Sequence, residues 1–264
     1  MDVRLDGRSA IITGASKGLG LAMAQTFAAS GAEVAMLARA EAGLQAALET
    51  IPPADRGRVA TFACDVSRAE DVGRTFEAVT ARFGKVDILI NNAGQSRAQA
   101  FDTITDDIWQ EDLDLKLFAA IRFTRLVWPG MKERKWGRII NVLNIGAKAP
   151  RAGGAPTVVS RAAGMALMKV LSQEGAPHNI LVNGMLVGII VSDQWARRHE
   201  AQVASGKSNE PFESFLAKMG AGVPLGRMGK PEEFAAMACL LCSELGGFTT
   251  GTAINMDGGA SPVV

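Results

Sequence analysis

The segment Thr13-Gly14-Ala15-Ser16-Lys17-Gly18-Leu19-Gly20 joins a short apolar run to an amphipathic one. Residues 9–13 have the composition of a buried strand, and residues 19–30 have helical spacing. Glycines at such a turn let the backbone bend sharply and approach a pyrophosphate, which the free N–H groups of the helix N-terminus can bind. Taken alone, the turn is equally consistent with an ordinary tight loop.

The rest of the chain repeats this alternation of strand and helix. Short β-rich runs are typical of strands at residues 9–13, 33–37, 58–63, 86–90, 138–142, 180–185 and 253–256. Amphipathic stretches predict helices at residues 19–30, 41–49, 69–83, 106–134, 155–175 and 232–245. Alternation of this kind implies right-handed crossovers and a parallel sheet covered on both faces, so the predicted class is a doubly wound α/β fold.

Composition excludes several classes of protein. Hydrophobic residues make up 48% of the 264 residues and charged residues 21%, as in an ordinary globular protein. The net charge of +1 gives no field that would hold nucleic acid or an anionic membrane, so a small-molecule partner is expected. Three scattered cysteines and the lack of an apolar leader favour the cytoplasm, and no apolar stretch is long enough to span a membrane.

Nothing divides the chain into separate domains, so we expect one domain over residues 1–264. Residues 192–222 depart from the alternating pattern and mix Trp195 and His199 with small and charged residues. We expect this segment to be a lid or substrate loop. The two histidines are too isolated for a metal site, so no metal is expected.

Two polar motifs follow predicted strands. Asp65-Val66 comes after the third strand, where a carboxylate can accept a hydrogen bond from an adenine amino group. The motif Asn91-Asn92-Ala93-Gly94 follows the fourth strand. Because ligands of open α/β sheets bind outside the carboxyl ends of the strands, both motifs fall where a dinucleotide would lie.

In combination with the first turn, these motifs make the chain resemble the short-chain dehydrogenase/reductase family over essentially its whole length. Further motifs that carry the resemblance are Gly137-Arg138-Ile139-Ile140-Asn141-Val142, Val182-Asn183 with Gly188, Pro224-Leu225-Gly226-Arg227, Pro231-Glu232-Glu233 and Asp257-Gly258-Gly259. The resemblance implies a seven-stranded Rossmann sheet that binds NAD or NADP. The cofactor-binding positions it implies are Gly14, Ser16, Lys17, Gly18, Leu19, Gly20, Arg39, Asp65, Val66, Asn92, Ala93, Gly94, Arg161, Gly188 and Ile190.

The end of the second strand indicates which dinucleotide is preferred. It reads Ala38-Arg39, with no carboxylate to accept a hydrogen bond from the ribose 2′-hydroxyl. Arg39 and Lys17 are instead able to reach a 2′-phosphate. The sequence therefore predicts NADP(H), with two solvated surface cations as the alternative.

At the catalytic positions the chain departs from the family. The family uses an Asn, a Ser, and a Tyr followed four residues later by a Lys. Alignment on the flanking motifs puts Lys116 at the Asn position and Asn144 at the Ser position. Thr157 takes the Tyr position and Arg161 the Lys position, and the chain has no tyrosine at all.

These replacements change the chemistry that is available. An aliphatic hydroxyl is a far weaker acid than a phenol, so Thr157 cannot itself replace the family's Tyr as the acid. Asn144 can still donate to a carbonyl oxygen, and a desolvated Lys116 can release a proton near neutral pH. Arg161 can still hold the nicotinamide ribose, and together with Lys116 it would place two cations in the pocket. Alternatively, Lys116 pairs with Asp112 or Asp114 at the surface.

Two functions remain open at this point. The first is an NADP-dependent oxidoreductase that acts on a small carbonyl or alcohol, with Asn144 polarising the carbonyl and Lys116 or water supplying the proton. The second is a non-redox protein with this fold: a lyase or dehydratase, a nucleotide-responsive binder, or a non-catalytic subunit. Because members of the family pack helices across a partner, we also expect a homodimer or homotetramer.

Overall fold

The computed structural model describes residues 2–264, and only the backbone of residues 193 and 194. Seven parallel strands form one sheet in the order β3-β2-β1-β4-β5-β6-β7. The strands are β1 (Ser9–Thr13), β2 (Glu33–Ala38), β3 (Val59–Ala63), β4 (Ile88–Asn91), β5 (Gly137–Asn144), β6 (Ile180–Val187) and β7 (Ala253–Met256). All seven predicted strands are confirmed, with bounds that differ by at most two residues. The predicted doubly wound Rossmann fold is therefore correct.

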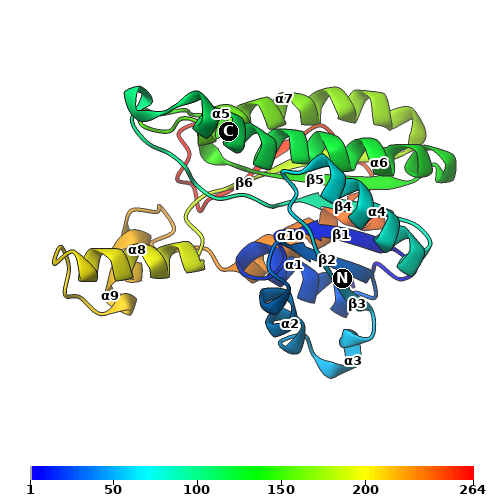
Figure 1. The fold of residues 1–264 in the computed structure, drawn as a ribbon, viewed down its shortest axis with the longest axis horizontal. Coiled ribbons are helices and arrows are strands. Elements are labelled where there is room, and N and C mark those ends of the chain that lie inside the picture. Colours follow the sequence, from blue (N-terminus) through cyan, green and yellow to red (C-terminus); the bar gives the residue numbers. More distant parts are fainter. Residues whose placement is uncertain (1) are drawn as a thin grey trace.

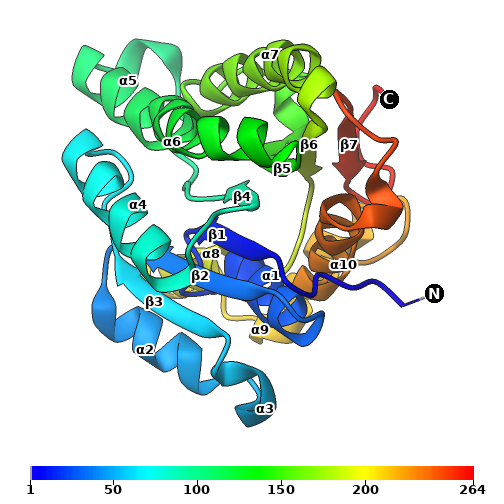
Figure 2. The same ribbon diagram turned by 90° about the vertical axis from the view of Figure 1, so that its right-hand side faces the viewer.

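Helices cover both faces of the sheet (Figures 1 and 2). They are α1 (Gly18–Ala29), α2 (Glu41–Glu49), α3 (Pro53–Arg56), α4 (Ala69–Phe83), α5 (Asp106–Leu113), α6 (Ala119–Arg134), α7 (Thr157–Gly175), α8 (Asp193–Ala204), α9 (Phe212–Ala221) and α10 (Pro231–Cys242). The helix predicted over residues 106–134 is confirmed, since α5, the π-helical turn Asp114–Phe118 and α6 follow one another with helical backbone angles throughout.

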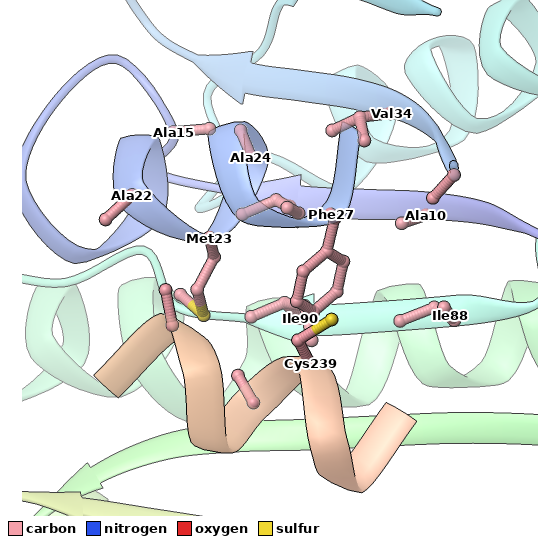
Figure 3. Packing of buried hydrophobic residues seen from close by; sticks show 14 of the residues in the cluster. Ala10, Ala15, Ala22, Met23, Ala24, Phe27, Val34, Ile88, Ile90 and Cys239 are labelled. Atoms are coloured by element: carbon pink, nitrogen blue, oxygen red, sulfur yellow. The ribbon is translucent and has the colours of Figure 1, made fainter. Parts of the chain in front are cut away.

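The two faces of the sheet have separate hydrophobic cores. Side chains alternate along β1, so that Ile12 packs with α1 and α10 while Ile11 packs with α4, α6 and α7. Figure 3 shows the first core, where Phe27 of α1 lies against Cys239 of α10 and Ile90 of β4. Each core holds one layer of helices in place, and the carboxyl edge of the sheet is left for a ligand.

The segment predicted as a lid contains two helices, α8 and α9, which the sequence pattern did not predict. They contact each other and project away from the sheet (Figure 1). The rings of His199, Phe212 and Phe215 pack together between them, with both phenylalanine centroids 5.3 Å from the His199 ring. This small aromatic cluster stabilises the pair of helices by apolar contact.

Strand order reverses between β1 and β4: β2 and β3 lie on one side of β1, and β4 to β7 lie on the other. A crevice opens at this kind of switch point, outside the carboxyl ends of the two strands. The glycine turn after β1 and the Asn-Asn-Ala-Gly motif after β4 both lie there. The topology thus places the two predicted motifs side by side.

Candidate functional site

The glycine turn between β1 and α1 depends on close backbone contact. Gly14 has a φ of 67°, in the left-handed region that favours glycine. A Cβ added to Gly20 would lie 2.2 Å from the carbonyl oxygen of Gly14, so only glycine allows the first turn of α1 to pack there. The backbone path of this turn therefore requires glycine at both positions.

Thr13 fixes this turn to the motif after β4. Its Oγ1 accepts hydrogen bonds from the backbone N–H groups of Asn92 (2.9 Å) and Ala93 (3.0 Å) and donates to the carbonyl of Ile90 (3.2 Å). The side chain of Asn92 also binds the turn, since its Nδ2 donates to the carbonyls of Thr13 (2.8 Å) and Gly14 (3.2 Å). The sequence analysis did not assign Thr13 this positioning role.

The N-terminus of α1 fits a dinucleotide phosphate. Lys17 is the N-cap residue, and no side chain caps the helix. A Cβ added to Gly18 would have no atom within 4 Å, so the side-chain direction of this residue is open. Uncapped N–H groups and the positive end of the helix dipole together favour an anion. Ser16 and Leu19, both partly exposed, lie in the same turn.

The residues predicted to contact the adenosine lie at the ends of β2 and β3. Arg39 is exposed directly after β2, and the backbone N–H of Ala15 donates to Leu37 of that strand at 3.0 Å. Asp65 receives hydrogen bonds at Oδ1 from the backbone and hydroxyl of Ser67. These bonds orient the carboxylate, while its Oδ2 remains for a donor. Val66 beside it is buried.

Gly188 lies at the carboxyl end of β6, as expected. A Cβ added there would lie 2.4 Å from Cβ of Asp257, so the position requires glycine. Ile190, also given as a cofactor-binding position, does not lie with its side chain on the surface. Its side chain is buried in the core beside α1 and α10, and its carbonyl accepts from Nε1 of Trp195 at 2.9 Å.

Lys116, Thr157 and Arg161 come together at the same edge of the sheet, although they lie on different elements. Lys116 lies in the π-helical turn Asp114–Phe118, a kind of turn that is frequent at functional sites. Thr157 and Arg161 occupy the first turns of α7. Asn144 ends β5, the strand next to β4. The structure thus assembles the residues that the sequence alignment had matched to the catalytic positions.

Lys116 is fully enclosed by protein groups. Its side chain is 1% exposed, its ammonium forms an ion pair with the buried carboxylate of Asp112, and it donates to Oγ1 of Thr157 at 3.0 Å. Burial lowers the pKa of Lys116 to about 8, against the opposing effect of Asp112. The alternative of a surface pair is therefore wrong in one respect: the partner is Asp112, but the pair is buried.

Arg161 lies against the motif after β4. Its Nη1 donates to the carbonyl of Val142 at 2.5 Å, and a Cβ added to Gly94 would lie 2.2 Å from its Nη2. Burial lowers the pKa of Arg161 to about 10, while Asp112 raises it, so the guanidinium is charged at neutral pH. Lys116 and Arg161 are thus both present as expected, and the carboxylate of Asp112 beside them leaves one net positive charge for the three groups.

Asn144 has unused hydrogen-bonding capacity. Its Oδ1 is buried and has no partner among the described residues. Leaving a buried acceptor unpaired costs about 1 to 3 kcal/mol, so such an atom indicates a missing ligand or water. Asn144 therefore has a free acceptor at the end of β5, which a water or a donor group of a ligand could use.

Three further residues belong to this cluster. Ser160 donates to Oδ2 of Asp112 at 2.6 Å, so both carboxylate oxygens are occupied. The backbone N–H of Arg97 donates to Oγ1 of Thr157 at 2.9 Å. The sequence signalled Asp112 only as a helix neighbour four residues from Lys116, and it gave no sign of the other two contacts. In the part of the chain that the structure describes, no three potential ligands form a metal site, and no helix could cross a membrane.

Comparison with known proteins agrees with this geometry. The profile of the family described as short chain dehydrogenase matches residues 8–203. The chain is 34% identical to a putative ketoacyl reductase of the monensin polyketide synthase from Streptomyces virginiae, over 96% of both chains. It is 32% identical to acetoacetyl-CoA reductase from Shinella zoogloeoides, over 96% of this chain and 98% of the relative.

A solved structure is similar over the full length. L-sorbose reductase from Gluconobacter frateurii, in complex with NADPH and L-sorbose, superposes with a TM-score of 0.94. The two chains are 33% identical, and the match covers 100% of each. The glycine turn, the strand order and the family profile lead to one conclusion: this chain belongs to the short-chain dehydrogenase family of oxidoreductases.

Proposed function

We propose that the protein is an NADP(H)-dependent reductase of small carbonyl compounds with a non-standard active site. The observation that carries this proposal is the N-terminus of α1 at the switch point of the sheet: no side chain among the described residues caps it, and a Cβ added to Gly18 would meet no atom within 4 Å. The likeness to a reductase solved with NADPH supports the choice of cofactor. The likeness to a relative named acetoacetyl-CoA reductase and to a putative ketoacyl reductase supports a carbonyl substrate.

Each part of the cofactor has a partner among this chain's residues. The backbone of Gly18 and Leu19 would hold the pyrophosphate, Arg39 and Lys17 the 2′-phosphate, and Asp65 the adenine. Arg161, held by Val142 and packed against Gly94, would bind the nicotinamide ribose. The bound cofactor supplies the hydride.

The remaining groups act on the substrate oxygen. The amide of Asn144 is able to donate to a carbonyl, which becomes more negative as the reaction proceeds. Lys116 is charged at neutral pH and bonded to Thr157, so it can provide a proton to the same region. No phenol is needed for this arrangement.

The second candidate is a non-redox protein that keeps the nucleotide site. The enclosure of Lys116 favours it, because an ammonium that is 1% exposed and paired with Asp112 does not reach a ligand directly. A lyase or dehydratase, a nucleotide-responsive binder and a non-catalytic subunit all remain within this candidate.

One experiment separates the two candidates. NADPH and NADH are titrated into the protein, and NADPH oxidation is then followed in single turnover against a panel of ketoses, 3-oxoacyl thioesters and simple ketones. Tight NADPH binding with oxidation by at least one carbonyl supports the reductase. Binding without oxidation by any of them supports the non-redox candidate, and no binding contradicts both.

We further propose that residues 1–264 act as one domain in a cytoplasmic homodimer or homotetramer. Val159 and Val170 of α7 are 47% and 52% exposed, which is consistent with a helix that packs against a partner. Light scattering after gel filtration tests this, since a monomer at micromolar concentration would contradict it.

A further inference from the structure

Thr157 is held in an orientation that fixes the role of its hydroxyl. A hydroxyl oxygen has two lone pairs and one hydrogen. Both lone pairs of Oγ1 are occupied, one by the backbone N–H of Arg97 at 2.9 Å and one by the ammonium of Lys116 at 3.0 Å. Only the O–H remains, so Thr157 is available as a donor.

Asp112 holds Lys116 in the form that donates. The carboxylate is fully buried, and it pairs with Lys116 through one oxygen while Ser160 donates to the other at 2.6 Å. Without this negative charge, a buried ammonium would lose its proton, because burial disfavours the charged form. Asp112 and Lys116 are therefore one functional unit.

We propose that Asp112, Lys116 and Thr157 form a proton relay that ends at the substrate oxygen. The relay rests on the proposed reductase function. In it, Lys116 is the source of the proton and Asp112 is a positioning residue. Thr157 is the catalytic residue that touches the substrate, which revises the expectation from its residue type, because it passes on the proton of Lys116 rather than acting as an acid alone.

The proton steps balance. When hydride reaches the carbonyl carbon, the C=O π pair moves to oxygen and forms an alkoxide. The alkoxide takes the proton from the Thr157 hydroxyl, while Oγ1 takes a proton from the Lys116 ammonium. The product is the alcohol, Thr157 is unchanged, and Lys116 is left neutral until water returns its proton after the product leaves.

Charged groups on three elements face Lys116. Asp112 on α5 favours its charged form, whereas Arg161 on α7 and Arg97, in the segment after β4, both disfavour it. The carboxylate of Asp114 is directed elsewhere, toward Arg122 at 2.8 Å. Asp114 is therefore a matched control for Asp112, two residues away in the same part of the chain.

The first arm of the test measures the charge on Lys116 directly. The protein is labelled with ¹⁵N,¹³C-lysine, the Lys116 signal is assigned by its loss in Lys116→Met, and its titration is followed by NMR without cofactor. Asp112→Asn should lower the midpoint by at least about one pH unit, a tenfold change in the dissociation constant. Asp114→Asn should leave it unchanged. An unshifted midpoint in Asp112→Asn overturns the relay.

The second arm measures turnover with the carbonyl that the substrate panel identifies. Thr157→Val should lower kcat at least about 100-fold, whereas Thr157→Ser, which keeps the hydroxyl, should remain within about tenfold of wild type. NADPH affinity should be unchanged in both variants. A fully active Thr157→Val overturns the relay. Wild type without turnover overturns the proposed function, and the titration then still decides whether Asp112 controls Lys116.

If Asp112→Asn fails to fold, the titration is repeated with Asp112→Glu. This variant keeps the charge but moves it, so it should shift the midpoint less than one unit and change kcat more than KM. A shift of more than one unit in this conservative variant would contradict control by the carboxylate charge.

Discussion

The Nζ of Lys116 lies 3.0 Å from Oγ1 of Thr157, although 41 residues separate the two in the chain. The first residue belongs to a π-helical turn and the second to the start of α7. The alignment made from the sequence matches them to the Asn and Tyr positions of the family's catalytic set. The contact joins two positions that the sequence treats as separate.

Stability should reveal that Asp112 and Lys116 depend on each other. Asp112→Asn and Lys116→Met each leave one buried charge without its partner, which costs about 3 to 5 kcal/mol. The double variant removes both charges and should be more stable than either single variant. Urea unfolding of the four proteins measures this coupling. Additive losses in the double variant would show that the pair is not coupled.

The pH dependence of stability should carry the signature of Lys116. Its pKa in the folded protein is about 8, below the ordinary value of 10.5. Below pH 8 both states hold the proton and the full cost of burial is present. Between these two values the unfolded state binds more protons, so the free energy of unfolding rises with pH, by about 3 kcal/mol over the whole interval.

Urea unfolding at about pH 7.5 and about pH 10 checks this rise. The free energy of unfolding of wild type relative to Lys116→Met should increase between the two values. Lys132→Met, which removes an exposed lysine at the end of α6, should follow wild type. A constant difference between wild type and Lys116→Met would mean that Lys116 titrates normally.

Cofactor preference should depend on Arg39. A guanidinium contact with the 2′-phosphate is worth about 1.5 to 3 kcal/mol, so Arg39→Ala should weaken NADPH at least about tenfold and leave NADH unchanged. Arg82→Ala, in the last turn of α4, is the control and should alter neither affinity. Calorimetric titration measures both, and equal affinities of wild type for the two cofactors would reject the assignment.

The glycine turn should not tolerate a methyl group. In Gly20→Ala the new Cβ would meet the Gly14 carbonyl at 2.2 Å, so we expect a loss of about 1 to 3 kcal/mol of stability and weaker NADPH binding. Gly73→Ala in α4 has no atom within 4 Å and should gain up to about 1 kcal/mol. Thermal unfolding compares the two, and equal effects would show that Gly20 is not a close-contact position.

Periodicity was sufficient to predict the sheet, because buried strands and amphipathic helices alternate in short and distinct runs. Over residues 106–134 it predicted the helix but gave no sign of the π-helical turn Asp114–Phe118 within it. It missed α8 and α9, which are held by His199 of one helix and two phenylalanine rings of the other rather than by a continuous apolar stripe.

The candidate site was predictable where it depends on local backbone. Gly14, Gly20 and Gly188 stand at positions where the path of the chain excludes a side chain. The contacts around Thr157 were not predictable, because they join residues that are far apart in sequence. Whether Lys116 is paired at the surface or buried depends on how α5 packs against α7, which no local pattern records.

The most direct test of the account is the pH dependence of the single-turnover rate of NADPH oxidation, with a reducible carbonyl and saturating cofactor. If Lys116 supplies the proton, the rate should be constant below about pH 8 and fall about tenfold per pH unit above it, as the ammonium is lost. In Lys116→Met the rate should be low and should not show this fall. A wild-type rate that stays constant to about pH 10, or a Lys116→Met variant as fast as wild type, would contradict the account.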